Sequence, residues 1–130
     1  MIRQQEEVVA GYNGTSNGHA EPVGIWRART FIHEHSDEKL SLGRIARTVN
    51  ISPNYLSEKF KEVTGENLVR YIARHRVEKA RELLRGQDLR VSEIGFAVGF
   101  QSLSQFNRVF KKLCGKSPTE FRRAARQGLS

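Results

Sequence analysis

The chain has 130 residues, which is enough for one small domain and a tail. It carries 22 Lys and Arg against 14 Asp and Glu, so its formal net charge is +8. Residues 1–51 hold six basic and six acidic side chains, whereas residues 52–130 hold sixteen and eight. A basic half attached to a neutral half indicates a polyanionic partner, with solubility alone as the alternative explanation.

Composition also excludes several classes of protein. Cys114 is the only cysteine, so an internal disulfide and a cysteine zinc site are excluded. No 18-residue apolar segment and no signal peptide occur, and we expect a soluble, cytoplasmic protein without a membrane partner. His33 and His35 point to opposite sides of a helix, which disfavours a shared metal site. Without a metal-ligand cluster, a phosphate loop or an activated nucleophile, we expect no enzyme and no cofactor.

The chain opens on a polar segment and then becomes helical. Residues 1–22 are poor in large apolar side chains and include a glycine-rich polar run at 11–18, which predicts a flexible linker or tail. A helix follows over 23–35, because one helical face holds Ile25, Ala28, Phe31, Ile32 and His35.

Residues 41–65 have the pattern of a helix-turn-helix motif. Ser41 and Ser52 are typical N-cap residues, and each precedes an apolar stripe of helical spacing. Asn50 tolerates the left-handed backbone of a sharp turn, and Gly65 ends the second helix. The predicted buried face of that second helix consists of Leu56, Phe60 and Val63.

A single amphipathic helix is predicted over residues 67–85, followed by Gly86. Nineteen helical residues span about 28 Å. Its apolar face, with spacings of three and four residues, consists of Leu68, Tyr71, Ile72, His75, Ala80, Leu83 and Leu84.

The helix-turn-helix pattern then returns over residues 91–115. Apolar positions match the first copy at a spacing of 49 before the turn and 50 after it, so the extra residue falls in the turn. Gly99 pairs with Asn50, and both can adopt a positive φ. Ser102 and Gln105 predict a capping box.

Two further helix starts depend on their caps. Arg90 stands where Ser41 stands in the first copy, so the cap of that helix is not defined by the sequence. A last helix over residues 117–126 begins with a capping box formed by Ser117 and Glu120.

The second helix of such a motif enters the DNA major groove, and successive grooves on one side of the duplex are about 34 Å apart. A connecting helix of about 28 Å predicts that one chain places two recognition helices near that distance. Outward polar residues are candidates for base contacts, namely Asn54, Ser57, Glu58, Ser104, Gln105, Asn107 and Arg108. Candidates for phosphate contacts are Ser41, Lys61, Ser102, Lys111, Lys112 and Lys116.

Each of these interpretations has a less specific alternative. Any solvated helix face carries polar side chains, and Trp26 fits either the core or the surface. Four aromatic residues could be stacking platforms for single strands, although their helical spacing favours the core. They are Phe100, Phe106, Phe110 and Phe121.

Residues 25–123 resemble the AraC/XylS family of transcription regulators. The most specific match runs from Ile94 to Pro118 and reads I-x-x-x-V-G-F-x-S-x-x-x-F-N-R-x-F-K-K-x-x-G-x-S-P. The first half matches more loosely, through L-x-x-I-A at 42–46, S-P-x-Y-L-S-x-x-F-K at 52–61 and Y-I-x-x-x-R-V-x-x-A-x-x-L-L at 71–84.

The resemblance implies an all-α, homeodomain-like DNA-binding domain over residues 23–126, with about seven helices and two helix-turn-helix subdomains. Two departures from the family pattern occur. Gly95 replaces the usual Ala and should loosen its helix by roughly 1 kcal/mol, and the acidic Glu58 is unusual opposite DNA. The positions where family members touch bases are Asn54, Ser57, Glu58, Leu103, Ser104, Asn107 and Arg108.

The predicted function is that of a sequence-specific regulator of transcription that binds double-stranded DNA at the nucleoid and activates a promoter through RNA polymerase. Family members usually carry a sensor or dimerisation domain, so we expect either a preceding domain or a small stand-alone member. The alternative is a helical protein-interaction module, such as a polymerase-binding or anti-regulator domain, without specific DNA binding.

Overall fold

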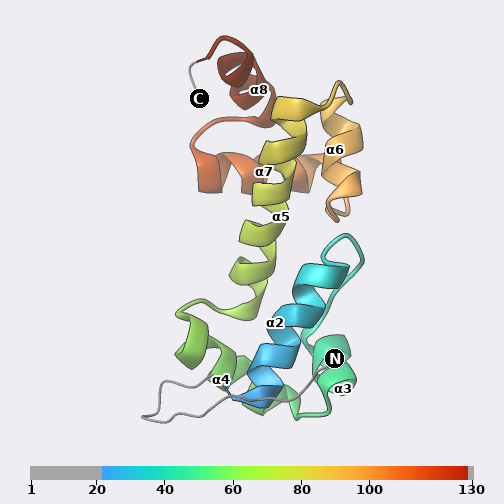
Figure 1. Ribbon diagram of the computed structural model, residues 1–130, viewed down its shortest axis with the longest axis vertical. Coiled ribbons are helices and arrows are strands. Elements are labelled where there is room, and N and C mark those ends of the chain that lie inside the picture. Colours follow the sequence, from blue (N-terminus) through green and yellow to red (C-terminus); the bar gives the residue numbers. More distant parts are fainter. Residues whose placement is uncertain (1–21, 129–130) are drawn as a thin grey trace.

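The computed structural model describes residues 22–128, so the predicted linker or tail at 1–22 lies outside them except for its last residue. The described residues form seven helices and no strand, which confirms the all-α prediction (Figure 1). The helices are α2 (Val23–His35), α3 (Leu42–Val49), α4 (Pro53–Thr64), α5 (Leu68–Gly86), α6 (Val91–Ala97), α7 (Leu103–Cys114) and α8 (Pro118–Arg126).

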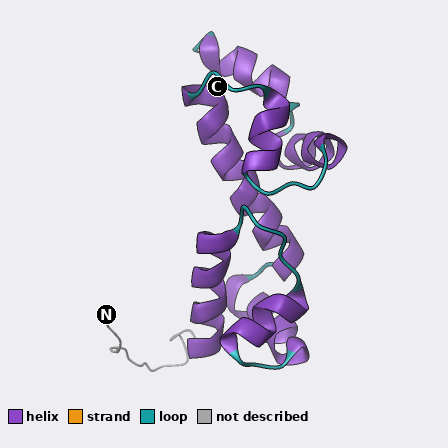
Figure 2. Ribbon diagram, turned by 90° about the vertical axis from the view of Figure 1, so that its right-hand side faces the viewer, coloured by secondary structure: helices purple, strands orange, loops and turns teal. Residues whose placement is uncertain are grey.

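The helices pack into two lobes that share α5. The first lobe contains α2, α3 and α4, and its core includes the α5 residues Leu68, Tyr71 and Ile72. The second lobe contains α6, α7 and α8, and its core includes Val77 and Ala80 of the same helix. Figure 2 shows the two lobes stacked along α5. The relative position of the lobes therefore depends on one continuous helix.

Local signals at the helix ends explain most of the element boundaries. Side chains of serine or asparagine residues accept a hydrogen bond from the backbone N–H three residues later at the starts of α3, α4, α5, α7 and α8. Asn50 has φ 61° and Gly99 has φ 115°, so both predicted turns adopt a positive φ. The capping box of Ser117 and Glu120 is confirmed by both of its hydrogen bonds.

Two other helix starts have hydrogen bonds that the sequence did not define or predicted differently. At α6 the Glu93 carboxylate accepts from the Arg90 backbone N–H at 2.8 Å, so the third helical residue provides the cap. At α7 the Ser102 hydroxyl caps the helix as predicted. The Gln105 side chain, however, accepts from the backbone N–H of Gln101 rather than that of Ser102. The prediction of a reciprocal capping box at this helix is therefore wrong.

Some burial predictions are also wrong. Val63 is 37% exposed, because it lies near the end of α4 beyond the part that the first core covers. His75 and Leu83 are only half-buried, whereas Val77, which the sequence analysis left out, is buried. Gly86 is the last residue of α5 and does not follow the helix.

Gly95 has a packing role that the sequence did not reveal. A Cβ atom built on Gly95 would lie 2.5 Å from Cδ2 and 2.8 Å from Cγ of Phe106. Phe106 is fully buried and packs against Phe100 and Phe110, so its ring has little room to move. The missing methyl group therefore lets α6 approach α7, and the prediction that this glycine only loosens α6 omits that contact.

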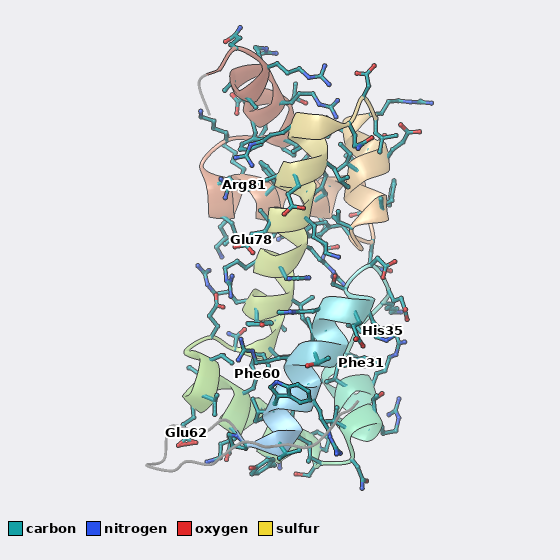
Figure 3. The ribbon with its side chains drawn as sticks, in the orientation of Figure 1. Phe31, His35, Phe60, Glu62, Glu78 and Arg81 are labelled. Carbon is teal, nitrogen blue, oxygen red and sulfur yellow. The ribbon has the colours of Figure 1, made fainter. Side chains whose placement is uncertain are left out.

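A polar cluster joins α2 to the middle of α5. The His33 and His75 rings stack in parallel with centroids 4.4 Å apart, and His33 Nε2 lies 2.7 Å from the Tyr71 hydroxyl. His35 faces elsewhere, stacking on Phe31 of the same helix (Figure 3). The two neighbouring histidines of α2 therefore do not converge. Within residues 22–128 no group of three His, Cys, Asp or Glu side chains could hold a metal ion.

The first prediction concerns Gly95→Ala. Overpacking against a buried ring costs about 1–3 kcal/mol, and the improved helix propensity returns about 1 kcal/mol at most. We expect a net loss in the free energy of unfolding, measured by urea denaturation. Gly86→Ala is the matched control, because a Cβ there meets nothing within 4 Å among the described residues, and we expect no loss. A Gly95→Ala protein as stable as the parent would contradict the packing role.

The second prediction concerns pH. Burial lowers the pKa of His33 below its ordinary value of 6.5, with further lowering by Arg29, Lys79 and Arg74 and opposition from Glu78. Burial likewise lowers the pKa of His75, followed by the charge of His33, Lys79 and Arg74, again opposed by Glu78. Both folded pKa values thus lie below the unfolded ones, so the folded protein binds fewer protons.

The two histidines favour the folded state when they are neutral. Their contribution to the free energy of unfolding is complete above pH 6.5 and is lost as pH falls through the folded pKa values. We therefore expect the free energy of unfolding, measured in urea from pH 7.5 to 5, to decline below pH 6.5. His75→Phe keeps a stacking ring but removes one titrating group, so its decline should be smaller. Equal pH slopes in His75→Phe and the parent would refute this explanation.

Candidate nucleic-acid interface

The second helix of each motif presents a polar face to solvent. On α4 the buried Leu56 and Phe60 hold one side against the first core. The opposite side exposes all four predicted contact residues of this helix, which are Asn54, Ser57, Glu58 and Lys61. Because spacings of three and four residues bring side chains onto one helical face, these four can meet a single surface.

The corresponding helix α7 repeats this arrangement 50 residues later. Phe106 and Phe110 occupy the buried positions. Leu103 is 40% exposed, and the other predicted contact residues are exposed except Gln105, which is half-buried. The exposed polar set on this helix is Ser104, Asn107, Arg108, Lys111 and Lys112.

The two recognition helices differ in charge although they match in geometry. Helix α4 carries two lysines and two glutamates, and Lys59 is paired with Glu62 at 2.9 Å. Helix α7 carries one arginine and two lysines and has no acidic residue. Figure 3 marks Glu62 on α4, at the end of the molecule remote from α7. The second lobe therefore offers the stronger attraction for a polyanion.

The two helices pack against different parts of α5. In Figure 1, α4 lies beside the lower half of α5 and α7 lies beside its upper half. Their exposed faces remain uncovered by the other lobe. Nineteen residues of α5 separate the motifs, a length of about 28 Å.

The remaining predicted phosphate contacts lie at helix ends. Ser41 and Ser102 are exposed, and each hydroxyl oxygen already accepts a capping hydrogen bond while its own O–H can still donate. Lys116 is exposed in the loop between α7 and α8. These three groups are accessible at the first turn of a helix or beside it, where anions are favourably bound.

The structure also modifies the list of candidates. Gln105 Oε1 is engaged by the Gln101 backbone N–H at 3.2 Å, so that oxygen is not free for a base. Its counterpart in the first motif is Tyr55, which is 43% exposed on α4 and was missed by the sequence analysis. The spacing of 50 residues between the motifs was the signal that could have identified it.

The aromatic alternatives are decided by burial. Phe100, Phe106, Phe110 and Phe121 all belong to the second core, so they are not stacking platforms on the surface. Trp26 is 58% exposed and belongs to the surface. No helix within residues 22–128 is both long and apolar enough to cross a membrane. The accessible chemistry of the two motifs is therefore polar and, on the second lobe, cationic.

Two helix-turn-helix motifs on one rod-like helix, each exposing a polar second helix, define a tandem helix-turn-helix domain. A family model described as "Helix-turn-helix domain" matches residues 45–124. The C-terminal domain of AraT, a response regulator from Geobacillus stearothermophilus, is 35% identical, with a TM-score of 0.78 over 80% of this chain and 87% of that one. The chain belongs to the AraC-type family of transcription regulators, whose helix-turn-helix domains bind DNA.

Other relatives agree with this assignment. The DNA-binding domain of the transcriptional factor AdpA, solved with a target DNA, is 25% identical, with a TM-score of 0.78 over 81% of this chain and 95% of that one. The MmsAB operon regulatory protein of Pseudomonas aeruginosa is 33% identical over 75% of this chain but only 32% of its own length. The HTH-type transcriptional regulator YijO of Escherichia coli K12, described as uncharacterized, is 38% identical over 73% and 34%. This chain thus spans about a third of these curated relatives.

Proposed function

We propose that this chain is a sequence-specific regulator that binds double-stranded DNA and inserts α4 and α7 into two successive major grooves. The observation that carries the proposal is the matched pair of exposed polar faces on α4 and α7, held by opposite halves of α5. About 28 Å of helix is close to the 34 Å that separates major-groove faces on one side of B-DNA. Because the two motifs differ in sequence, the binding site is expected to be asymmetric.

The contact residues are assigned roles by their chemistry. Arg108 suits the O6 and N7 acceptors of guanine, and Asn54 and Asn107 suit adenine. Glu58 can accept only from cytosine N4 or adenine N6, and its negative charge opposes approach to the phosphates. The side chains proposed to complete the base-contact set are Ser57, Leu103, Ser104 and Gln105.

Affinity is proposed to come mainly from the second lobe. Lys111 and Lys112 on α7 lie on a helix with no acidic residue, whereas Lys61 on α4 shares its helix with two glutamates. Phosphate contacts release condensed counterions and so give salt-dependent affinity without specificity. The remaining proposed phosphate contacts are Ser41, Ser102 and Lys116.

We further propose a non-catalytic role in transcription activation through contact with RNA polymerase, in the cytoplasm at the nucleoid. Support comes from membership of a family of DNA-binding transcription regulators. A sensor or dimerisation domain N-terminal to this chain is proposed because the curated relatives are about three times as long as their match to it. Residues 23–126 would then be the DNA-binding domain of such a regulator.

The third prediction compares Arg108→Ala with Lys111→Ala on duplexes selected from a random pool by the parent protein. Arg108→Ala should weaken the selected duplex by about 1–3 kcal/mol and relax the preference at one base pair. Lys111→Ala should weaken selected and random duplexes alike and reduce the slope of log affinity against log salt by about one. Fluorescence anisotropy at several salt concentrations measures both effects.

Arg123→Ala is the control, because Arg123 is an exposed basic residue on α8 outside the proposed interface. It removes the same charge as the other two variants, and we expect it to leave the preference among duplexes unchanged. Equal affinity of the parent for every duplex would contradict sequence-specific binding. Unchanged DNA binding in both test variants, with a protein partner still bound, would instead favour the helical interaction module.

A further inference from the structure

Arg76 lies in the turn of α5 between the two hydrophobic cores. The first core uses α5 as far as Ile72, and the second begins at Val77. Residues 73–76 therefore contribute to neither core, and their contacts with the first lobe are polar or stacked, as in the pairing of His75 with His33. Long helices are rarely straight and can curve gently. A continuous α5 therefore does not by itself fix the angle between the lobes.

The Arg76 side chain reaches from this turn to the first lobe. Its Nε donates to the Ser36 carbonyl oxygen at 2.7 Å, and its Nη2 donates to the Glu38 carbonyl oxygen at 2.8 Å. Ser36 is the C-cap of α2 and is only 2% exposed. The guanidinium thus satisfies two carbonyls just beyond the end of α2, where helical partners are missing. Hydrogen bonds from a charged donor are stronger than those between neutral groups.

The second lobe meets the same place from the other side. Arg76 Cζ lies 6.0 Å from the ring centroid of Phe100, which is buried in the second core. A Cβ atom on Gly99 would lie 2.2 Å from the Ser36 carbonyl oxygen and 2.7 Å from Arg76 Nε. The backbone of the second motif's turn therefore packs directly against the end of α2 and against this guanidinium, where no side chain would fit.

In Figure 1 the upper end of α2 and the lower end of α6 meet beside α5, so this contact lies to the side of the α5 axis. A contact away from the axis resists bending of α5, because the two lobes cannot tilt apart without breaking that contact. The turn that it holds leads directly into α7, since Gly99 and Phe100 precede Leu103 by only a few residues. Any tilt at residues 73–76 would change the position and direction of α7 relative to α4.

We propose that Arg76 is a positioning residue that fixes the distance and rotation between the two recognition helices and so determines the half-site spacing that the protein accepts. The inference rests on the proposed binding of two successive major grooves. Arg76 itself is half-buried between the lobes and is assigned no contact with DNA. Adding one base pair between half-sites moves the second by about 3.4 Å and rotates it by about 35°, which a rigid pair of helices cannot follow.

The first arm of the test uses the full chain and duplexes with the two halves of a selected site at the natural spacing and one base pair closer or farther. The parent protein should bind the altered duplexes about 5- to 150-fold more weakly, the loss of roughly one good base contact. In Arg76→Ala this discrimination should shrink by at least about fivefold, the lower end of typical couplings between sites. The affinity for the natural spacing should also fall.

The second arm needs no DNA. Nitroxide labels on Glu62→Cys of α4 and Thr119→Cys of α8, in a Cys114→Ala background, report the distance between the lobes by pulsed electron spin resonance. The parent should give one narrow distance distribution, and Arg76→Ala a broader one. Lys79→Ala is the control in both arms. It removes one exposed positive charge from α5 and leaves the contacts of Arg76 with Ser36, Glu38 and Phe100 in place. It should behave like the parent.

Arg76→Gln provides a second variant, because it keeps most of the stem while losing the charge and the two-pronged donor. Circular dichroism checks that each variant is folded. A sharp spacing preference or a narrow distance distribution in either folded Arg76 variant would overturn the proposal, and so would unfolding of both, since Arg76 would then be needed for the fold itself. If the random pool yields no preferred duplex, the proposed function fails, while the label distances still decide the role of Arg76.

Discussion

One helix provides part of the wall of two separate hydrophobic cores, and the rest of the architecture depends on this arrangement. Residues 68–72 of α5 pack into the first core, and residues 77–84 pack into the second. Because a continuous helix is stiff, neither lobe can move along the rod without breaking its own core. The spacing of the two lobes along the α5 axis is thereby set by helix geometry, whereas the angle between them depends on contacts beside that axis.

The two lobes share a frame but differ in detail, and each difference has a physical cause. The first turn uses Asn50 at φ 61°, a conformation that asparagine tolerates. The second uses Gly99 at φ 115°, where the Ser36 carbonyl oxygen and the Arg76 side chain leave no room for any Cβ. The recognition helices differ as well, since α4 has equal numbers of acidic and basic side chains and every charged side chain of α7 is positive. An asymmetric site is the natural partner of such a chain.

Local signals made much of this fold predictable from the sequence. Serine caps, the positive-φ turn residues and apolar spacings of three and four depend on residues within one turn of each other, and they define the helices correctly. The exposure of the candidate contact residues was predictable for the same reason, except at Gln105, which is half-buried. Val63 was predicted to be buried on helical spacing alone, but spacing does not show where the core ends.

The contact between the two lobes at Arg76, Ser36 and Gly99 could not be predicted in this way. Arg76 and Ser36 are 40 residues apart, and nothing local to either residue shows that they meet. Gly95 likewise looked like a weak helix former, because its contact is with a ring on a different helix. The angle between the lobes is a property of such long-range contacts, and a sequence pattern carries no direct record of them.

Hydroxyl-radical footprinting of the chain on its selected duplex would show whether both recognition helices bind the same side of the DNA. We expect two protected patches on one face of the duplex, centred about one helical turn apart and covering different base sequences. A single protected patch, or two patches on opposite faces of the duplex, would contradict this expectation.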